Sequence, residues 1–182
     1  MTIEAFEREP KIDIRQETPD DAPAIRGVNE AAFGRPDEAD LVDALRDRGV
    51  PLISLVAEVE NVVVGHVLFS PARIEAPGST ASTAVAALGP MAVLPSHQRR
   101  GIGSRLVRAG LEACRDAGHG VVVVLGHPGF YPRFGFAPSR PLGIVSEFDV
   151  PDEVFMVAEL CPGALAGCGG VARYLPDFAN LG

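Results

Sequence analysis

Two arginines and two glycines stand directly before a long amphipathic segment, and this junction is the part of the sequence best suited to binding an anion. It reads Gln98-Arg99-Arg100-Gly101-Ile102-Gly103-Ser104. A helix that starts here leaves its first backbone N–H groups without acceptors and turns the positive end of its dipole toward them. The glycines keep side chains away from those groups, and the arginines add positive charge. The pattern predicts a site for a diphosphate.

Two common nucleotide-binding motifs do not fit this junction. A Walker loop ends in Gly-Lys-Ser or Gly-Lys-Thr, whereas this chain has Gly103-Ser104-Arg105. A dinucleotide fingerprint needs a third glycine where Leu106 stands, and a tight turn directly after a strand, where residues 95–100 intervene. The diphosphate must therefore be held by another kind of motif.

Hydrophobic periodicity predicts the elements that position the junction. Residues 102–117 form an amphipathic helix pattern, and the apolar run 121–125 is typical of a buried strand. Gly89-Pro90 interrupts the β-rich run 82–94 and predicts a bulge or a separation of strands, because proline cannot donate to a sheet. The other predicted elements are a strand at 11–16, two helices between 18 and 49, hairpin strands at 52–59 and 62–70, a loop at 71–80, a short helix at 128–134, and strands near 143–148 and 155–160.

Composition and charge limit the class of protein. The 182 residues, 47% of them hydrophobic, suit one domain over 1–182. A net charge of -8 predicts no nucleic-acid partner and no anionic membrane partner. Cysteines at 114, 161 and 168 lack zinc-ligand spacing, so no metal is predicted. The chain has no apolar leader and no run of about 18 apolar residues, so we expect a cytoplasmic protein.

Two motifs together resemble those of the GNAT superfamily of acetyl-CoA-dependent N-acetyltransferases. The junction is similar to the family segment Gln/Arg-x-x-Gly-x-Gly/Ala, which follows a strand. Phe130-Tyr131-Pro132-Arg133-Phe134-Gly135-Phe136 is similar to the family segment Tyr-x-x-Leu/Phe-Gly-Phe after the fifth strand. The order of predicted elements agrees over about residues 11–160, and the tail resembles that of predicted bacterial acetyltransferases of this superfamily.

The resemblance implies a fold and a set of site residues. The fold is an α/β fold with a mixed, mostly antiparallel sheet of about six to seven strands, splayed fourth and fifth strands, and about four helices. Acetyl-CoA is the implied co-substrate, and Tyr131 is the implied general acid for the departing thiolate. The residues implied to bind acetyl-CoA are Met91, Ala92 and Val93 along its pantetheine arm, and Arg99, Arg100, Gly101, Ile102, Gly103 and Ser104 around its pyrophosphate.

The sequence does not identify the base that receives the proton of the amine. Many family members place a glutamate on the fourth strand, but residues 86–91 of this chain contain no ionisable side chain. His127, just after the fifth strand, could take the proton directly or through water, or could simply be an exposed loop histidine. His66 is interpreted as structural. Acidic residues at 37, 38, 40 and 43 could attract a cationic amine or could form a solvated helix face.

The resemblance implies transfer of an acetyl group from acetyl-CoA to a primary amine of a small molecule or protein, by direct attack in a ternary complex. The alternative is a non-catalytic module that binds or senses acyl-CoA. A homodimer formed through the C-terminal strands is possible under either hypothesis. The sequence predicts neither the acceptor amine nor the preferred acyl group.

Overall fold

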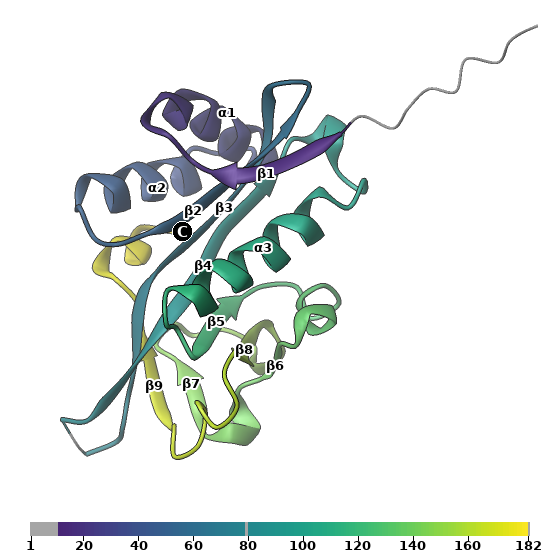
Figure 1. Ribbon diagram of the computed structural model, residues 1–182. Coiled ribbons are helices and arrows are strands. Elements are labelled where there is room, and N and C mark those ends of the chain that lie inside the picture. The colour runs from purple at the N-terminus through teal and green to yellow at the C-terminus, as the bar shows by residue number, and fades with distance from the viewer. Residues whose placement is uncertain (1–10, 79, 182) are drawn as a thin grey trace, which may run out of the picture.

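The structure, a computed structural model, describes residues 11–78 and 80–181, which form a nine-stranded sheet with helices on both faces (Figure 1). The strand order is β1-β2-β3-β4-β5-β8-β6, and β9 pairs with β3 and β7. Pairing is antiparallel except for β4–β5 and β7–β9. The strands are β1 Ile12–Gln16, β2 Ile53–Val59, β3 Val62–Glu75, β4 Ser82–Val93, β5 Val121–Leu125, β6 Ala137–Pro138, β7 Ile144–Ser146, β8 Phe155–Glu159 and β9 Gly170–Arg173.

This sheet confirms the predicted mixed, mostly antiparallel class. It has more strands than the predicted six to seven because the short strands β6 and β9 were not predicted, whereas β7 lies within the strand expected near 143–148. The two additional strands contain two and four residues, too few for a period-2 pattern to stand out from a loop.

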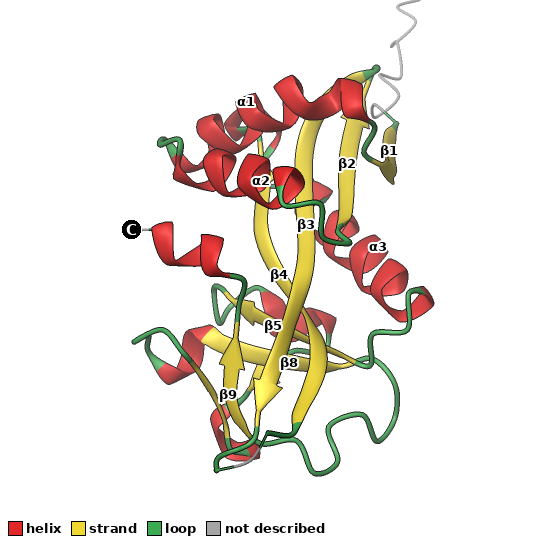
Figure 2. Ribbon diagram, turned by 90° about the vertical axis from the view of Figure 1, so that its left-hand side faces the viewer, coloured by secondary structure: helices red, strands yellow, loops and turns green. Residues whose placement is uncertain are grey.

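The helices divide between the two faces of the sheet (Figure 2). Helices α1 (Ala22–Phe33) and α2 (Asp37–Asp47) pack on one face, and α3 (Ile102–Asp116) packs on the other. Each face of the sheet has its own apolar core. The core under α3 contains Leu106, and the core under α1 and α2 contains Leu45. The predicted short helix near 128–134 is a 3-10 turn at Tyr131–Phe134. Among the residues described, no helix is both long and apolar enough to cross a membrane.

Strand β3 is longer than the sequence predicted, because residues 71–75 were expected in a loop. Pro71 favoured that expectation, since a proline removes a donor from a sheet. In the structure, pairing of β3 with β2 ends at Phe69 and pairing with β9 begins at Arg73. Pro71 therefore lies where one edge of β3 has no neighbouring strand, a position that tolerates proline.

The C-terminal tail, which the sequence left unassigned, folds back against α2. After β9, a 3-10 turn at Pro176–Asn180 packs beneath α2. Asp177 of this turn accepts two hydrogen bonds from Arg48, at 2.8 and 3.1 Å. The backbone N–H of Tyr174 donates to Glu147 at 2.6 Å. These hydrogen bonds hold the tail in place at Tyr174 and at Asp177.

His66 of β3 lies in a buried polar cluster beneath α1, in agreement with its predicted structural role. Its Nδ1 is 3.2 Å from the amide nitrogen of Asn29, and its Nε2 is 2.9 Å from the hydroxyl of Ser54. Ser54 also donates to Glu17, whose carboxylate receives two further bonds from Arg46. Burial lowers the pKa of His66 from 6.5 to about 4, so the ring is neutral at pH 7.

This buried histidine should make the protein less stable in mild acid. Between pH 6.5 and pH 4 the unfolded chain binds a proton at His66 that the folded chain does not, so the free energy of unfolding falls as the pH falls. Between pH 7 and pH 5 the loss should be about 2 kcal/mol. Urea titrations of the wild type and of His66→Gln measure it. An equal decline in both proteins would assign the acid sensitivity to other groups.

The packing of α3 on β3 requires a glycine at position 110. A Cβ atom there would lie 2.2 Å from Cε2 of Phe69, a buried side chain. We expect Gly110→Ala to lower the free energy of unfolding by about 1–3 kcal/mol through overpacking. Gly27→Ala in α1 is the matched control, because its Cβ would meet no atom within 4 Å. The control should be neutral or more stable, since alanine favours helix.

Candidate active site

Strands β4 and β5 pair only over a short distance and then separate. The parallel ladder joins Ala86, Ala87 and Leu88 to Val122, Val123 and Val124. After Leu88, Gly89 and Pro90 interrupt the ladder, while β4 continues to pair with β3 as far as Val93. The structure thus separates the two strands at the position that the sequence predicted.

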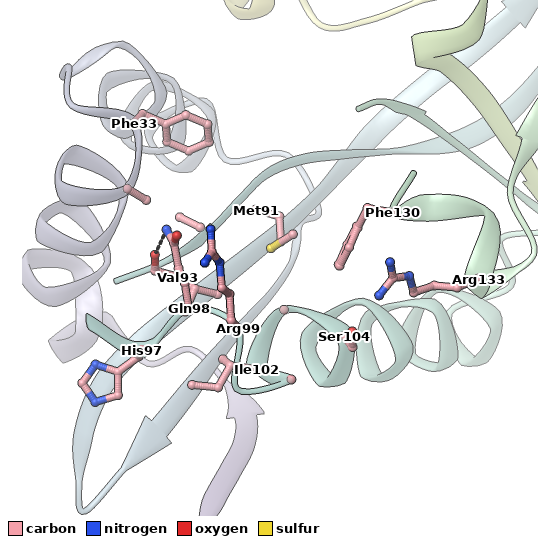
Figure 3. A pocket seen from close by; sticks show the side chains of 14 residues that line it. Phe33, Met91, Val93, His97, Gln98, Arg99, Ile102, Ser104, Phe130 and Arg133 are labelled. Carbon is pink, nitrogen blue, oxygen red and sulfur yellow. Dashed lines mark hydrogen bonds between the residues drawn. The ribbon is translucent and has the colours of Figure 1, made fainter. Parts of the chain in front are cut away.

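The open edge of β4 presents backbone groups. The N–H of Leu94 donates to Val64 on the β3 side at 2.9 Å. Because backbone groups alternate sides along a strand, those of Ala92 also point toward β3, and those of Met91 and Val93 point toward the open edge. The side-chain amide of Gln98 donates to the carbonyl of Val93 at 3.0 Å (Figure 3). This bond ties the loop before α3 to the strand.

The first turn of α3 carries unpaired donors beside that edge. Within the part of the chain that the structure describes, the N–H groups of residues 99–104 donate to no backbone or side-chain acceptor. The first helix-type bond after them runs from Arg105 to Gly101 at 3.1 Å. Arg99 and Gly101 adopt left-handed backbone angles, with φ of 63° and 79°. Left-handed residues next to a helix start bring successive N–H groups to one side, a geometry that binds anions.

The arginines at this helix start are not neutralised by the protein. Over residues 11–78 and 80–181, no carboxylate pairs with Arg99, Arg100 or Arg105, all of which are exposed. The chain as a whole carries a net charge of -8, and elsewhere its carboxylates pair with arginines 15, 26, 35, 46, 48, 73, 140 and 173. Unpaired cations against that background form a local site for a negative ligand.

A cavity of about 500 Å³ lies between the open edge of β4 and the start of α3. Figure 3 shows Met91 and Phe130 on one side of it and Arg99 on the other. Every predicted acetyl-CoA-binding residue except Arg100 lines this cavity. The lining residues from that prediction are Met91, Ala92, Val93, Arg99, Gly101, Ile102, Gly103 and Ser104. Arg100 borders a neighbouring hollow together with Arg105.

Gly103 is not explained by the packing of the protein. A Cβ atom there would lie 3.4 Å from Sδ of Met91 and 3.7 Å from Cζ of Phe130, which are ordinary contact distances. Glycine inside a helix costs about 1 kcal/mol relative to alanine, and nothing in the described structure requires it here. The absent side chain leaves room in the cavity, as the close approach of a ligand to the helix start would need.

A second cavity, of about 560 Å³, adjoins the first and contains Tyr131. The two cavities share Phe33, Met91 and Phe130 in their walls. The second one is otherwise lined mainly by apolar side chains, and its ionisable residues are Glu38, His127, Tyr131 and Tyr174.

Tyr131 is held firmly in the wall of this second cavity. Its ring makes edge contacts with Phe130 and Phe136, with centroids 5.1 and 5.5 Å apart. Gly126 allows this position, because a Cβ atom there would lie 2.1 Å from Cε2 of Tyr131. Burial raises the pKa of Tyr131 to about 12. The phenol therefore keeps its proton at neutral pH.

Of the remaining ionisable candidates, His127 and Glu38 line the Tyr131 cavity, whereas Asp37, Asp40 and Asp43 do not. His127 is exposed and lines the same cavity as Tyr131. Of the acidic cluster in α2, Asp40 and Asp43 pair with Arg26, and Asp37 pairs with Arg35. Glu38, the buried member of the cluster, also pairs with Arg35 but lines the Tyr131 cavity.

Comparison with known proteins identifies the family. Residues 13–139 match the family model described as an acetyltransferase (GNAT) domain. The chain is 41% identical over 136 residues to the uncharacterized N-acetyltransferase YjhQ of Escherichia coli strain K12, covering 73% of this chain and 74% of that protein. The chain belongs to the GNAT acetyltransferase family.

Solved structures resemble the fold over nearly the whole chain. A crystal structure of the E. coli N-acetyltransferase YhbS in complex with CoA has a TM-score of 0.90, with 30% identity, and covers 98% of this chain and 97% of that one. A GNAT acetyltransferase from Brucella melitensis in complex with acetyl-CoA has a TM-score of 0.76, with 36% identity, and covers 93% and 99%.

The sequence did not identify the cavity-lining residues that come from segments far from the two motifs. Phe33 at the end of α1 lines both cavities, and Tyr174 and Phe178 of the tail line the second. No local pattern marks these residues, because their role comes from long-range packing. Gln98 was within the predicted motif, but its bond to Val93 requires the loop geometry.

Proposed function

We propose that this protein transfers the acetyl group of acetyl-CoA to a primary amine, by direct attack of the amine on the thioester in a ternary complex. The observation that carries the proposal is the run of unpaired N–H groups at residues 99–104, next to a strand edge that is also open. Together they offer donors for a pyrophosphate and a backbone edge for a pantetheine amide chain. The complexes of the two relatives with CoA and acetyl-CoA support this assignment.

In this proposal the protein acts first by positioning. The amides of residues 99–104 and the arginine side chains hold the pyrophosphate at the start of α3. The open backbone groups of Met91 and the N–H of Val93, whose carbonyl accepts from Gln98, hold the pantetheine arm along β4, as a further strand would be held. The thioester then reaches the second cavity. Fixing it beside a bound amine replaces a bimolecular encounter with a nearly unimolecular step.

The chemistry needs one proton to leave the amine and one to reach sulfur. The neutral amine forms a C–N bond with the thioester carbonyl, and the C–S bond breaks as the tetrahedral intermediate collapses. Tyr131 donates its phenolic proton to the departing thiolate and regains a proton from solvent. The proton released from nitrogen leaves to solvent through the cavity, which His127 also lines.

Gly103→Val tests the cofactor half of the proposal. The two γ-methyl groups would enter the cavity beside Met91, so we expect the KM for acetyl-CoA to rise at least about 10-fold, while stability stays within about 1 kcal/mol because valine is no worse in a helix than glycine. Gly103→Ala is the matched control and should change KM less than about 3-fold, since its Cβ makes only ordinary contacts. Unchanged acetyl-CoA binding in the valine variant would place the cofactor elsewhere.

Tyr131→Phe tests the acid. We expect kcat to fall by roughly 100-fold or more, with acetyl-CoA affinity unchanged by calorimetry, because in the proposal the hydroxyl acts only on the leaving sulfur. The assay is thiol release from acetyl-CoA across a panel of primary amines. A variant as active as the wild type would remove Tyr131 from the chemistry. Tight CoA binding with no turnover for any amine would favour the non-catalytic acyl-CoA-binding module instead.

A further inference from the structure

A basic hollow of about 450 Å³ adjoins the first cavity at the start of α3. The two spaces share His97, Arg99 and Ile102 in their walls. Figure 3 shows His97 at the end of the first cavity that lies away from Phe130. The hollow has no lining residue in common with the cavity that contains Tyr131. It therefore extends the site away from the proposed chemistry.

The wall of this hollow is strongly basic. Four of its seven lining residues have basic side chains, namely His97, Arg99, Arg100 and Arg105, and the other three are Ile12, Val59 and Ile102. Within the described part of the chain, no acidic residue lines it. In a protein with a net charge of -8, three arginines in one concave wall indicate an anionic ligand.

The carboxylates of the two flanking strands lie on the other face of the sheet. Ile12 of β1 is paired with Val59 of β2, and both pack in the core under α3. Because side chains alternate along a strand, those of Asp13 and Glu58 point to the opposite face. Glu58 pairs there with Arg15. These two carboxylates therefore do not neutralise the hollow.

Arg100 and Arg105 line this hollow but not the first cavity. Among the described residues, Arg100 makes no hydrogen bond or ion pair. Nη1 of Arg105 lies 3.5 Å from the carbonyl oxygen of Ile12, the limit of a hydrogen bond, and both arginines are exposed. A pyrophosphate held by Arg99 and the amides of residues 99–104 leaves these two guanidinium groups free. They indicate a further anionic group beside the pyrophosphate.

Coenzyme A carries such a group one ribose away from its pyrophosphate. The pantetheine arm leaves the pyrophosphate on one side, and the ribose with its 3′-phosphate leaves on the other. An arm that runs along β4 toward Tyr131 places the ribose at the end of the first cavity where His97 lies. A phosphate monoester carries about two negative charges at neutral pH, and the planar guanidinium of arginine matches its oxygens.

We propose that the basic hollow binds the 3′-phosphate of CoA and that Arg100 and Arg105 hold it. The inference rests on the proposed use of acetyl-CoA, and it divides the arginine side chains between two groups: Arg99 serves the pyrophosphate, and the other two serve the 3′-phosphate. The protein should therefore select free CoA thioesters over the same pantetheine arm carried by a protein, because a carrier-bound arm has no 3′-phosphate. Arg100 and Arg105 are specificity-determining residues for the acetyl donor.

Calorimetry with CoA and with 3′-dephospho-CoA tests the assignment, because the two ligands differ only in the 3′-phosphate. Exposed ion pairs are weak, so we expect CoA to bind roughly 3- to 10-fold more tightly in about 50 mM NaCl. The advantage should shrink in about 500 mM NaCl, because salt screens the charges. Equal affinities at low salt would overturn the inference.

The double variant Arg100→Gln/Arg105→Gln removes both cations. The affinity ratio of CoA to 3′-dephospho-CoA should fall below about 2, while the midpoint of urea unfolding stays unchanged because both side chains are exposed. Arg108→Gln is the matched control for Arg105→Gln, because Arg108 is also exposed on α3 but lines neither space. Arg105→Gln should lower the ratio and Arg108→Gln should not. A double variant with the wild-type ratio contradicts the proposal.

An acidic carrier protein is the competing ligand for the two arginines. An acetylated acyl carrier protein brings the pantetheine arm and a negative surface but no 3′-phosphate. In the thiol-release assay it should be a poorer donor than acetyl-CoA. If it matches acetyl-CoA, or if the double variant impairs its use more than the use of acetyl-CoA, the arginines face an acidic protein and the inference is wrong.

Failure of this inference can be told apart from failure of the proposed function, because binding is measured without turnover. A preference for CoA that the double variant loses, with no turnover of any amine, supports the 3′-phosphate site while the transferase proposal fails. Equal binding of CoA and 3′-dephospho-CoA, with turnover, overturns the inference alone. No binding of either ligand overturns both.

Discussion

The separation of β4 from β5 after Leu88 is the constraint on which the rest of the site depends. Backbone N–H and C=O groups inside a sheet are normally paired with a neighbouring strand. Here the ladder stops at three residue pairs, and β4 goes on alone at one edge. The cavity, the exposed backbone of Met91 and Val93, and the direct approach to the start of α3 all follow from that one interruption.

Electrostatics gives the opening its preference for a negative ligand. Most arginines of this acidic protein are engaged by carboxylates, but those at positions 99, 100 and 105 are not, within the residues described. Their charge adds to the field of the 15-residue helix α3. Since the donors of residues 99–104 are already oriented and unpaired, a bound anion would need little rearrangement of the backbone.

The sequence predicted the parts of the site that are local. Gly89-Pro90 marked the separation of strands, and the arrangement of arginines and glycines at 98–104 marked the helix start, because proline, glycine and helix periodicity act over a few residues. Pro71 misled the prediction of β3, since its tolerance depends on which strands flank that edge. Glu38, Tyr174 and Phe178 could not be assigned to the second cavity, because only the tertiary fold brings α2 and the tail to Tyr131.

The folded-back tail has a consequence for how this architecture can diversify. The donors and arginines at the start of α3 belong to one continuous stretch, whereas the far wall of the second cavity comes from residues 174–181, attached to α2 and the β7–β8 region by a few polar bonds. Tyr174 and Phe178 belong to the buried core under α2, so substitutions in that wall must preserve its packing, but they leave the start of α3 unchanged. Under the proposed function, changes confined to this terminal segment would alter the choice of acceptor independently of acetyl-CoA binding.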